Sequence, residues 1–463
     1  MNTQSTRALV IAGLSGGSGK SVASVGLLAA LKARGLQVQP FKKGPDYIDA
    51  GWLAQAAGRP CYNLDAYLAG PEQVQATFYG HLAGADLALV EGNRGLFDGV
   101  DAAGSSSTAE LAILLHLPVL LMMNCTKATR TMAALALGCR NFESRLKLAG
   151  VLLNQVANAR QEKVIREALA GIDMPVLGVI PKLGRDIFPM RHLGVTPHQE
   201  YAGAEQAVSH LGGLAARHFD LDAILALTQP TAPAAAAAAA VPGAAAGLKI
   251  GVLRDAAFQF YYEENLEALR AGGAELAAIN ALTAPALPSG LHALYIGGGF
   301  PETSAQALAE NTAFLASLRA AIDAGLPVYA ECGGLIYLGR SLLLDGREYP
   351  LAGVFPASFA LSKKPQAHGY SRLRVEGQNA FYRPGQLIRG HEFRYSTVQD
   401  WSGRSAALGM RVERGTGFYA GRDGLVYKNV LALYTHVLAS ATPEWAAGML
   451  AAAARYAAEK TDR

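Results

Sequence analysis

Cysteine and long apolar runs are both scarce in this chain. Its four cysteines, at positions 61, 125, 139 and 332, lie far apart and form no C-x-x-C pair. This excludes a disulfide framework and a cysteine-rich zinc site, and it is typical of a reducing cytoplasm. The longest apolar candidate, residues 232–247, is mostly alanine and is interrupted by two prolines, so we expect no membrane-spanning helix. The first apolar run is short and leads directly into a glycine-rich loop, unlike a signal peptide, and we expect a cytoplasmic protein.

An excess of one charge is also lacking. The chain has 41 lysines and arginines against 37 acidic residues, a formal net charge of +4. Dedicated nucleic-acid binders usually carry concentrated basic runs, so the balance argues against that class. It leaves room for small anionic substrates such as nucleotides and polycarboxylates. With 463 residues, 51% of them hydrophobic and 17% charged, the chain is expected to form two or three globular domains.

A glycine-rich segment, GLSGGSGKS at residues 13–21, follows an apolar run at 8–12 and precedes a helical pattern at 22–32. A strand, a glycine loop and a helix in this order form a phosphate cradle, in which backbone N–H groups face phosphate oxygens. Gly13 stands seven positions before Lys20, one more than in the usual motif. The alternative is a plain βα turn with a solvent-exposed lysine. The residues assigned to the nucleotide are Gly17, Ser18, Gly19, Lys20 and Ser21, and the Ser21 hydroxyl is also assigned to Mg²⁺.

Apolar runs of strand length alternate with amphipathic helical patterns up to about residue 190 and again from residue 248. This alternation predicts an α/β protein with mainly parallel sheets covered by helices. Residues 228–247, rich in alanine and proline, are typical of an interdomain linker. We therefore predict a nucleotide-binding domain at 1–227, a linker at 228–247 and a second α/β domain at 248–463.

Charged loops follow two further predicted strands of the first domain. Lys42, in FKKGPDYID, suits phosphate or substrate carboxylates, and Asp46 and Asp49 suit Mg²⁺ or the substrate. Glu91 ends another strand, where a P-loop enzyme places a carboxylate for Mg²⁺. Asp98 lies between glycines in a loop that approaches a ligand. Ligands gather at the carboxyl ends of parallel strands, so we expect these side chains to share one crevice. The alternative is a set of ordinary charged turns.

Cys332, in AECGGL, stands between a predicted strand and a predicted helix, the arrangement of a nucleophile elbow. We expect an exposed sulfur with a lowered pKa, because a helix N-terminus stabilises a thiolate. His436 follows an apolar strand and is the preferred general base, while His391 and His368 are weaker candidates. The alternative is a buried core cysteine. An oxyanion hole is assigned to Gly298, Gly299 and Gly333.

Several motifs together resemble one family. They are GGSGKS, FKKGPDYIDAGW, NLD at residues 63–65, VEGNRGLFDG, AECGGL and Thr435-His436. The first half is similar to dethiobiotin synthetase, and the second half to class I glutamine amidotransferases of the cobyrinate type. The whole chain resembles the cobyrinate or hydrogenobyrinate a,c-diamide synthases. The resemblance implies a P-loop NTPase-like domain followed by a flavodoxin-like domain, and it is compatible with a homodimer.

The resemblance also implies a reaction. Glutamine would lose ammonia through a thioester on Cys332, and ATP with Mg²⁺ would convert a tetrapyrrole carboxylate into an acyl phosphate that ammonia attacks. Leu438 stands where many relatives have a triad glutamate, so a Cys332–His436 dyad is expected. The loop at residues 93–110 is also similar to a sirohaem-amidating branch, and nickel-sirohydrochlorin is a third candidate. A regulatory P-loop ATPase and an enzyme using only free ammonia are further alternatives.

Overall fold

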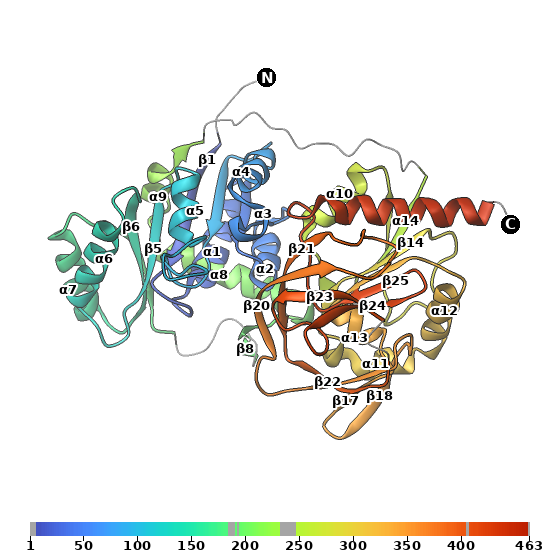
Figure 1. Cartoon of the computed structure of the whole chain (residues 1–463). Helices are drawn as coiled ribbons and strands as arrows, with labels where there is room; N and C mark the ends of the chain where they lie inside the picture. Colours follow the sequence, from blue (N-terminus) through green and yellow to red (C-terminus); the bar gives the residue numbers. More distant parts are fainter. Residues whose placement is uncertain (1–5, 184–189, 192–193, 232–246, 404–406, 462–463) are drawn as a thin grey trace. The chain divides into compact units, whose positions relative to one another are not determined.

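The computed structural model describes residues 6–183, 190–191, 194–231, 247–403 and 407–461 (Figure 1). The chain divides into an N-terminal unit, Met1–Ala238, and a C-terminal unit, Ala239–Arg463. Both are α/β, which confirms the predicted fold class. Of the predicted linker at 228–247, residues 232–246 lie outside the described residues. Gln229–Pro230 within it forms strand β10, which pairs antiparallel with β1.

The sheet of the N-terminal unit has the strand order β3-β2-β4-β1-β5-β6-β7. All pairs along this path are parallel. Strands β1, β4, β5 and β7 are nearly continuous apolar runs, as expected for strands buried on both faces. Their bounds are β1 (Arg7–Gly13), β2 (Val38–Lys43), β3 (Tyr62–Leu64), β4 (Leu87–Glu91), β5 (Val119–Asn124), β6 (Leu148–Val156) and β7 (Val176–Pro181), with β8 (Met190–Arg191) and β9 (Gly194–Val195) forming a separate pair.

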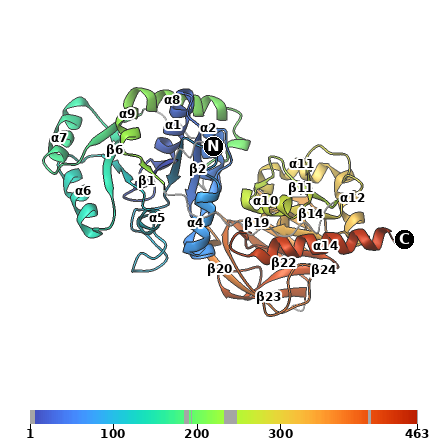
Figure 2. The same ribbon diagram turned by 90° about the horizontal axis from the view of Figure 1, so that it is seen from above.

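Helices cover both faces of this sheet (Figure 2). Successive side chains of β1 point to opposite faces, so Leu9 and Ile11 pack in one core with α1, α2, α8 and α9. Ala8 and Val10 pack in the other core with α4, α5, α6 and α7. The helix bounds are α1 (Lys20–Ala33), α2 (Ile48–Ala57), α3 (Ala66–Ala69), α4 (Pro71–Gly80), α5 (Thr108–Leu114), α6 (Thr131–Phe142), α7 (Ala159–Ala170), η1 (His198–Glu200), α8 (Ala204–His218) and α9 (Leu221–Leu227).

The main sheet of the C-terminal unit has the order β13-β11-β14-β16-β25-β24-β23-β20-β21. It is parallel from β13 to β25, as predicted, and continues into antiparallel strands that the sequence analysis did not assign. A smaller sheet, β18-β17-β19-β22, and a two-stranded pair, β12-β15, complete the strands. The bounds are β11 (Lys249–Leu253), β12 (Phe258–Phe260), β13 (Glu275–Ile279), β14 (Ala293–Ile296), β15 (Gly298–Gly299), β16 (Val328–Glu331), β17 (Ser341–Leu344), β18 (Arg347–Pro350), β19 (Ala357–Leu361), β20 (Ala367–Val375), β21 (Leu387–Arg394), β22 (Ser396–Trp401), β23 (Leu408–Arg414), β24 (Arg422–Tyr427) and β25 (Val430–Leu433).

Strand β14 divides its side chains between two cores. Leu294 and Ile296 pack with α11, α12 and α13, and Tyr295 packs with α10 and α14. Trp445 of α14 lies against Tyr295, with ring centroids 5.0 Å apart. None of the described helices is long and apolar enough to cross a membrane. The helix bounds are α10 (Glu263–Ala271), η2 (Pro301–Ser304), α11 (Ala305–Glu310), α12 (Thr312–Asp323), α13 (Gly333–Tyr337) and α14 (Pro443–Thr461).

Candidate active sites

The glycine loop between β1 and α1 requires glycine at two positions. Gly17 and Gly19 have φ values of +72° and +98°, the left-handed region that favours glycine. A Cβ on Gly19 would also come within 2.3 Å of Nδ2 of Asn154. Asn154 donates from that nitrogen to the carbonyl of Ser18 at 3.0 Å and so holds the loop. The sequence analysis missed Asn154, although β6 carries it to the same strand-end edge as the loop.

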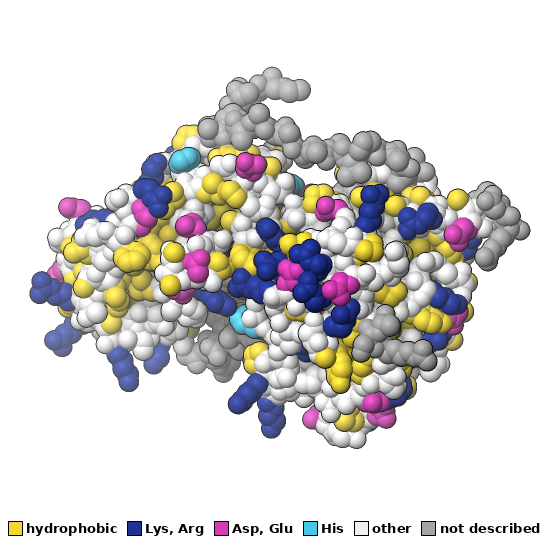
Figure 3. Space-filling model, in the orientation of Figure 1, with side chains coloured by type: hydrophobic (Ala, Val, Ile, Leu, Met, Phe, Trp, Pro, Cys, Tyr) yellow, Lys and Arg dark blue, Asp and Glu magenta, His cyan; other side chains and the backbone are white. Residues whose placement is uncertain are grey.

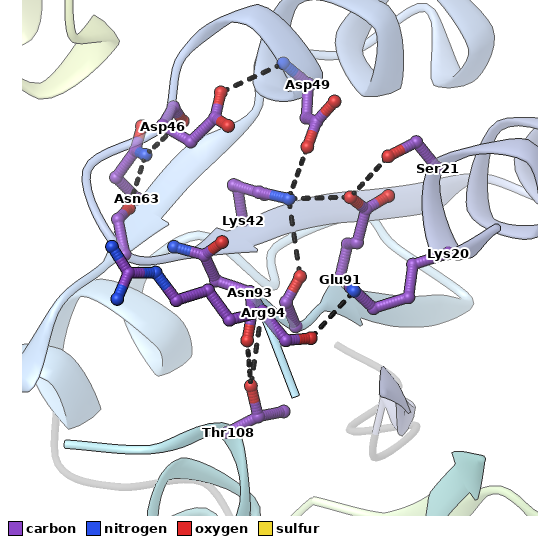
Figure 4. Close-up of polar contacts among 12 residues, drawn as sticks. Lys20, Ser21, Lys42, Asp46, Asp49, Asn63, Glu91, Asn93, Arg94 and Thr108 are labelled. Atoms are coloured by element: carbon purple, nitrogen blue, oxygen red, sulfur yellow. Dashed lines mark hydrogen bonds and ion pairs between the residues drawn. The ribbon is translucent and has the colours of Figure 1, made fainter. Parts of the chain in front are cut away.

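Lys20 contacts carbonyl oxygens in this structure (Figure 4). Its Nζ donates to the carbonyl of Ser15 at 3.1 Å and to that of Arg94 at 2.7 Å. Burial and the positive charge of Lys42 lower the pKa of Lys20. Phosphate oxygens are stronger acceptors for an ammonium group than neutral carbonyls. Lys20 is therefore placed to exchange these carbonyls for a bound phosphate.

Lys42 of β2 lies between two carboxylates, Glu91 at the end of the neighbouring strand β4 and Asp49 in the first turn of α2 (Figure 4). Its Nζ is 2.6 Å from Oε1 of Glu91 and 2.7 Å from Oδ2 of Asp49. Burial opposes the charge on Lys42, but the two carboxylates outweigh it and raise its pKa. Ser21 donates to Oε1 of Glu91 at 3.1 Å. The structure thus brings together four residues that the sequence predicted to share a crevice.

The loop that carries Asp46 is held by local hydrogen bonds. Oδ1 of Asp46 accepts the Asp49 N–H at 3.1 Å, and Asn63 donates to the carbonyls of Gly44 and Asp46. Burial and the charge of Asp49 raise the pKa of Asp46 to about 7. Asp98 closes its own turn by accepting the Gly95 N–H at 2.9 Å. Asp46 therefore gains or loses its proton near neutral pH, whereas the contact with Lys42 keeps Asp49 ionised.

The chemistry of Ser21 and Glu91 fits a divalent cation. Oε2 of Glu91 is buried and has no hydrogen-bond partner among the described residues. The described residues contain no group of three or more His, Cys, Asp or Glu that could hold a metal by themselves. Mg²⁺ usually takes one or two carboxylates and completes its shell with phosphates and water. The single free carboxylate oxygen beside a hydroxyl suits that mode.

Cys332 sits on a sharp turn between β16 and α13, with a φ of +46° and a ψ of −96°. This strained backbone is typical of a nucleophile elbow. Its N–H donates to the carbonyl of Leu433 at 2.8 Å, at the end of the neighbouring strand β25. A Cβ on Gly333 would come within 3.0 Å of the Gly299 nitrogen, and one on Gly298 within 2.4 Å of Cε1 of His436. The predicted nucleophile, base and oxyanion glycines therefore lie together.

The prediction that the Cys332 sulfur is exposed and has a lowered pKa is wrong. Cys332 is only 6% exposed, and burial raises the pKa of its thiol to about 12. The guanidinium of Arg394 acts in the opposite direction but is outweighed. Desolvation penalises a thiolate more than the N-terminus of the five-residue helix α13 favours it. The thiol is protonated here, so attack requires a base to remove its proton.

His436 has a carboxylate neighbour that the sequence analysis missed. Its Nδ1 lies 3.5 Å from Oε2 of Glu331, the residue before Cys332. The carboxyl group of Glu331 accepts the Val437 N–H at 3.2 Å and the Tyr295 hydroxyl at 3.3 Å. Burial lowers the pKa of His436 to about 3 and raises that of Glu331 to about 8. The only sequence signal for Glu331 was its place at the end of β16.

The other two histidines differ in position. His391 exchanges backbone hydrogen bonds with His436, at 3.0 and 2.8 Å, and their rings are 6.5 Å apart. His368 is exposed on β20, with its ring against Phe393. Neither ring nitrogen of His436 has a hydrogen-bond partner among the described residues. His436 thus keeps a free nitrogen as well as the contact with Glu331.

Comparison with known proteins gives matches for both units. A CobQ/CobB/MinD/ParA nucleotide binding domain matches residues 9–188, and a CobB/CobQ-like glutamine amidotransferase domain matches residues 249–444. The cobyrinate a,c-diamide synthase of Magnetococcus marinus is 42% identical over 437 residues, covering 93% of each chain. The hydrogenobyrinate a,c-diamide synthase of Streptomyces coelicolor is 39% identical, covering 94% of this chain and 95% of the relative. The chain belongs to the cobyrinate and hydrogenobyrinate a,c-diamide synthase family.

Proposed function

We propose that this chain converts the a and c acetate carboxylates of cobyrinate or hydrogenobyrinate into amides, using ATP and ammonia released from glutamine. The observation that carries the proposal is that one chain contains two clusters of residues suited to catalysis. One is a phosphate loop beside Ser21 and Glu91, and the other is a cysteine elbow beside His436 and Glu331. Relatives that carry the corresponding names match the chain along most of its length.

The N-terminal unit activates the carboxylate. A free carboxylate does not react with ammonia, so it first attacks the γ-phosphate of ATP to give an acyl phosphate, which ammonia then displaces. Lys20 exchanges its carbonyl partners for phosphate oxygens and stabilises the transferring group. Mg²⁺ would be held by the Ser21 hydroxyl and Glu91, and when bound it neutralises phosphate charge. Asp46 and Asp49 orient the acetate side chain.

The C-terminal unit releases ammonia. Cys332 transfers its proton to the free nitrogen of His436 and attacks the side-chain amide of glutamine. The oxyanion receives N–H groups from the glycine loops, and Glu331 stabilises the imidazolium that forms. Protonation of the leaving nitrogen gives ammonia and a thioester, which water hydrolyses to glutamate.

A substrate panel tests the proposal. Purified protein is incubated with ATP, Mg²⁺, glutamine and one of four macrocycles: cobyrinate, hydrogenobyrinate, sirohaem or nickel-sirohydrochlorin. We expect mass spectrometry to find two carboxylate-to-amide conversions on a corrinoid. Amidation of sirohaem or nickel-sirohydrochlorin alone would overturn the substrate assignment. Failure to amidate any of the four would overturn the function.

A further inference from the structure

A buried arginine of the C-terminal unit lies near Cys332 without a carboxylate partner. Arg394, at the end of β21, is 8% exposed and has no ion pair within 4.0 Å among the described residues. Its Nη1 donates to the carbonyl of Ser396 at 2.6 Å and its Nη2 to that of Gly417 at 2.7 Å. The guanidinium lies 3.9 Å from the ring centroid of Tyr434. Every one of these partners is neutral.

Other arginines on the same antiparallel strands lie at the surface and form ion pairs. Figure 3 shows lysine and arginine side chains gathered on the surface over β20, β21 and β23. On these strands, Arg372 of β20 pairs with Glu413 at 3.0 Å, and Arg411 of β23 pairs with Glu376 at 3.0 Å. Burying a charge without a direct counter-charge is unfavourable, whereas an exposed charge remains solvated. Burial therefore destabilises the charge of Arg394, whereas the exposed, paired arginines have no such penalty.

The nearest buried carboxylates do not contact Arg394. Glu392 accepts the N–H groups of Thr416 and Gly417, at 3.3 and 3.1 Å. Asp423 accepts those of Gly424 and Tyr434, at 2.8 and 3.2 Å. Glu392 thereby holds the turn whose Gly417 carbonyl fixes the guanidinium. Among the described residues, Nε of Arg394 has no hydrogen-bond partner, and each Nη, which carries two N–H groups, donates to one carbonyl.

The strand that carries Arg394 also pairs with the segment that carries His436. Strand β21 runs past His436, and a Cβ on Gly390 would come within 2.3 Å of the His436 carbonyl oxygen. Tyr434, under the guanidinium, lies two residues before His436. Among the charged groups acting on the Cys332 thiol, the Arg394 guanidinium has the largest effect.

We propose that Arg394 binds the α-carboxylate of glutamine through the free Nε edge of its guanidinium. A planar guanidinium and a carboxylate form two parallel charge-assisted hydrogen bonds, which fix both position and orientation. The bond supplies the missing counter-charge only when the amide donor is present. It selects free glutamine over a glutamine whose α-carboxyl group is blocked. This inference rests on the proposed release of ammonia from glutamine.

The test compares two donors in two proteins. Release of glutamate from L-glutamine, and of glutamate α-amide from L-glutamine α-amide, are measured for wild type and for Arg394→Gln in the full-length chain. In the second donor an uncharged carboxamide replaces the α-carboxylate. We expect wild type to favour L-glutamine in kcat/KM by about 10- to 100-fold, the value of a charged hydrogen bond. We expect Arg394→Gln to lose that factor for L-glutamine and to keep its rate with the α-amide.

Matched variants separate binding from folding. Arg372→Gln removes an exposed, paired arginine on the neighbouring strand β20 and should leave both donors unchanged. Arg394→Lys keeps the charge but loses the planar guanidinium and its two parallel donors, so it should retain part of the preference for L-glutamine. Equal loss with both donors in Arg394→Gln and Arg394→Lys, or an unchanged preference, would overturn the inference. Wild-type protein that hydrolyses no glutamine would refute the proposed function itself, and the inference with it.

Discussion

The pair of Glu331 and His436 shows how burial sets the resting state of the C-terminal site. Burial favours the neutral form of both side chains, so the imidazole is free to accept a proton. Once His436 is protonated, the adjacent carboxyl group is stabilised as its anion. The contact of 3.5 Å is long for a hydrogen bond, and we expect it to shorten when glutamine binds. Glu331 therefore acts as a positioning residue for the base.

Replacing Glu331 with glutamine should change both activity and the pH dependence of stability. Folding raises the pKa of Glu331 from 4.5 to about 8, so the folded state keeps a proton that the unfolded chain releases. Wild-type stability is therefore lost as the pH rises through this window, and Glu331→Gln has no such loss. The melting temperature of the variant minus that of wild type should increase from about pH 5 to about pH 8. A difference that is constant with pH would contradict the raised pKa.

The same variant should lose glutamine-dependent turnover on the order of 10²-fold while its ammonia-dependent turnover is unchanged. Its pH–rate profile should also shift, because the imidazolium loses its carboxylate neighbour. A purely structural role would lower the yield of folded protein without moving the profile. Measuring kcat against pH for the folded fraction distinguishes the two.

Lys42 offers a second test at the residue scale, in the N-terminal unit. Lys42→Met leaves Glu91 and Asp49 without their shared cation, and removing one partner of a buried ion pair typically costs about 3–5 kcal/mol. Arg34→Met breaks the exposed pair with Asp222 and should cost about 0–1 kcal/mol. Urea denaturation of both variants checks the contrast. Equal destabilisation would show that the Lys42 pair is solvated like a surface pair.

At the scale of elements, both sites are built where strands end. In the N-terminal unit, the loop after β1, Lys42 of β2 and Glu91 of β4 meet because parallel strands present their carboxyl ends at one edge. In the C-terminal unit, Cys332 follows β16 and His436 follows β25, and these two strands pair in parallel. The short strand β15 supplies the facing glycines. The order and direction of the strands therefore bring these residues together, whatever side chains they carry.

Strand β15 gives a prediction about this placement. Gly298→Ala puts a methyl group within 2.4 Å of Cε1 of His436, so the imidazole must move away from its position beside Glu331. Glutamine-dependent turnover should fall at least about 10-fold, since small displacements of a base are costly. Nucleotide binding, measured by calorimetry with an ATP analogue, should be unchanged. Full glutamine-dependent activity in Gly298→Ala would show that the imidazole of His436 accommodates the methyl group without loss of function.

For the whole molecule, the two activities should separate by mutation. Cys332→Ala removes the nucleophile and should abolish glutamine-dependent amidation while free ammonia still supports it. Lys20→Ala removes the phosphate ligand of the other unit and should abolish amidation with either nitrogen source. Product analysis with glutamine and with ammonium salts checks both variants. Loss of ammonia-dependent activity in Cys332→Ala, or its retention in Lys20→Ala, would contradict the assignments.

The sequence by itself determined the chemistry-bearing segments of this protein. The P-loop, Lys42, Glu91 and Cys332 each follow a buried apolar run, and such local patterns predict both the strand and the polar residue at its end. The alternation of strands and helices likewise predicted two α/β units. It did not predict the antiparallel strands β20 to β24, because they carry charged residues along their length and form no continuous apolar run.

Only the tertiary structure decided how the C-terminal site works. Glu331 and His436 are 105 positions apart in the sequence and meet because β16 and β25 pair. Arg394 reaches the region of Cys332 because β21 passes His436, and burial rather than the helix end sets the thiol pKa. Charge proximity and desolvation depend on what surrounds a group in space. The local sequence identified the nucleophile and the candidate base, and the fold added the carboxylate of Glu331 and the buried guanidinium of Arg394.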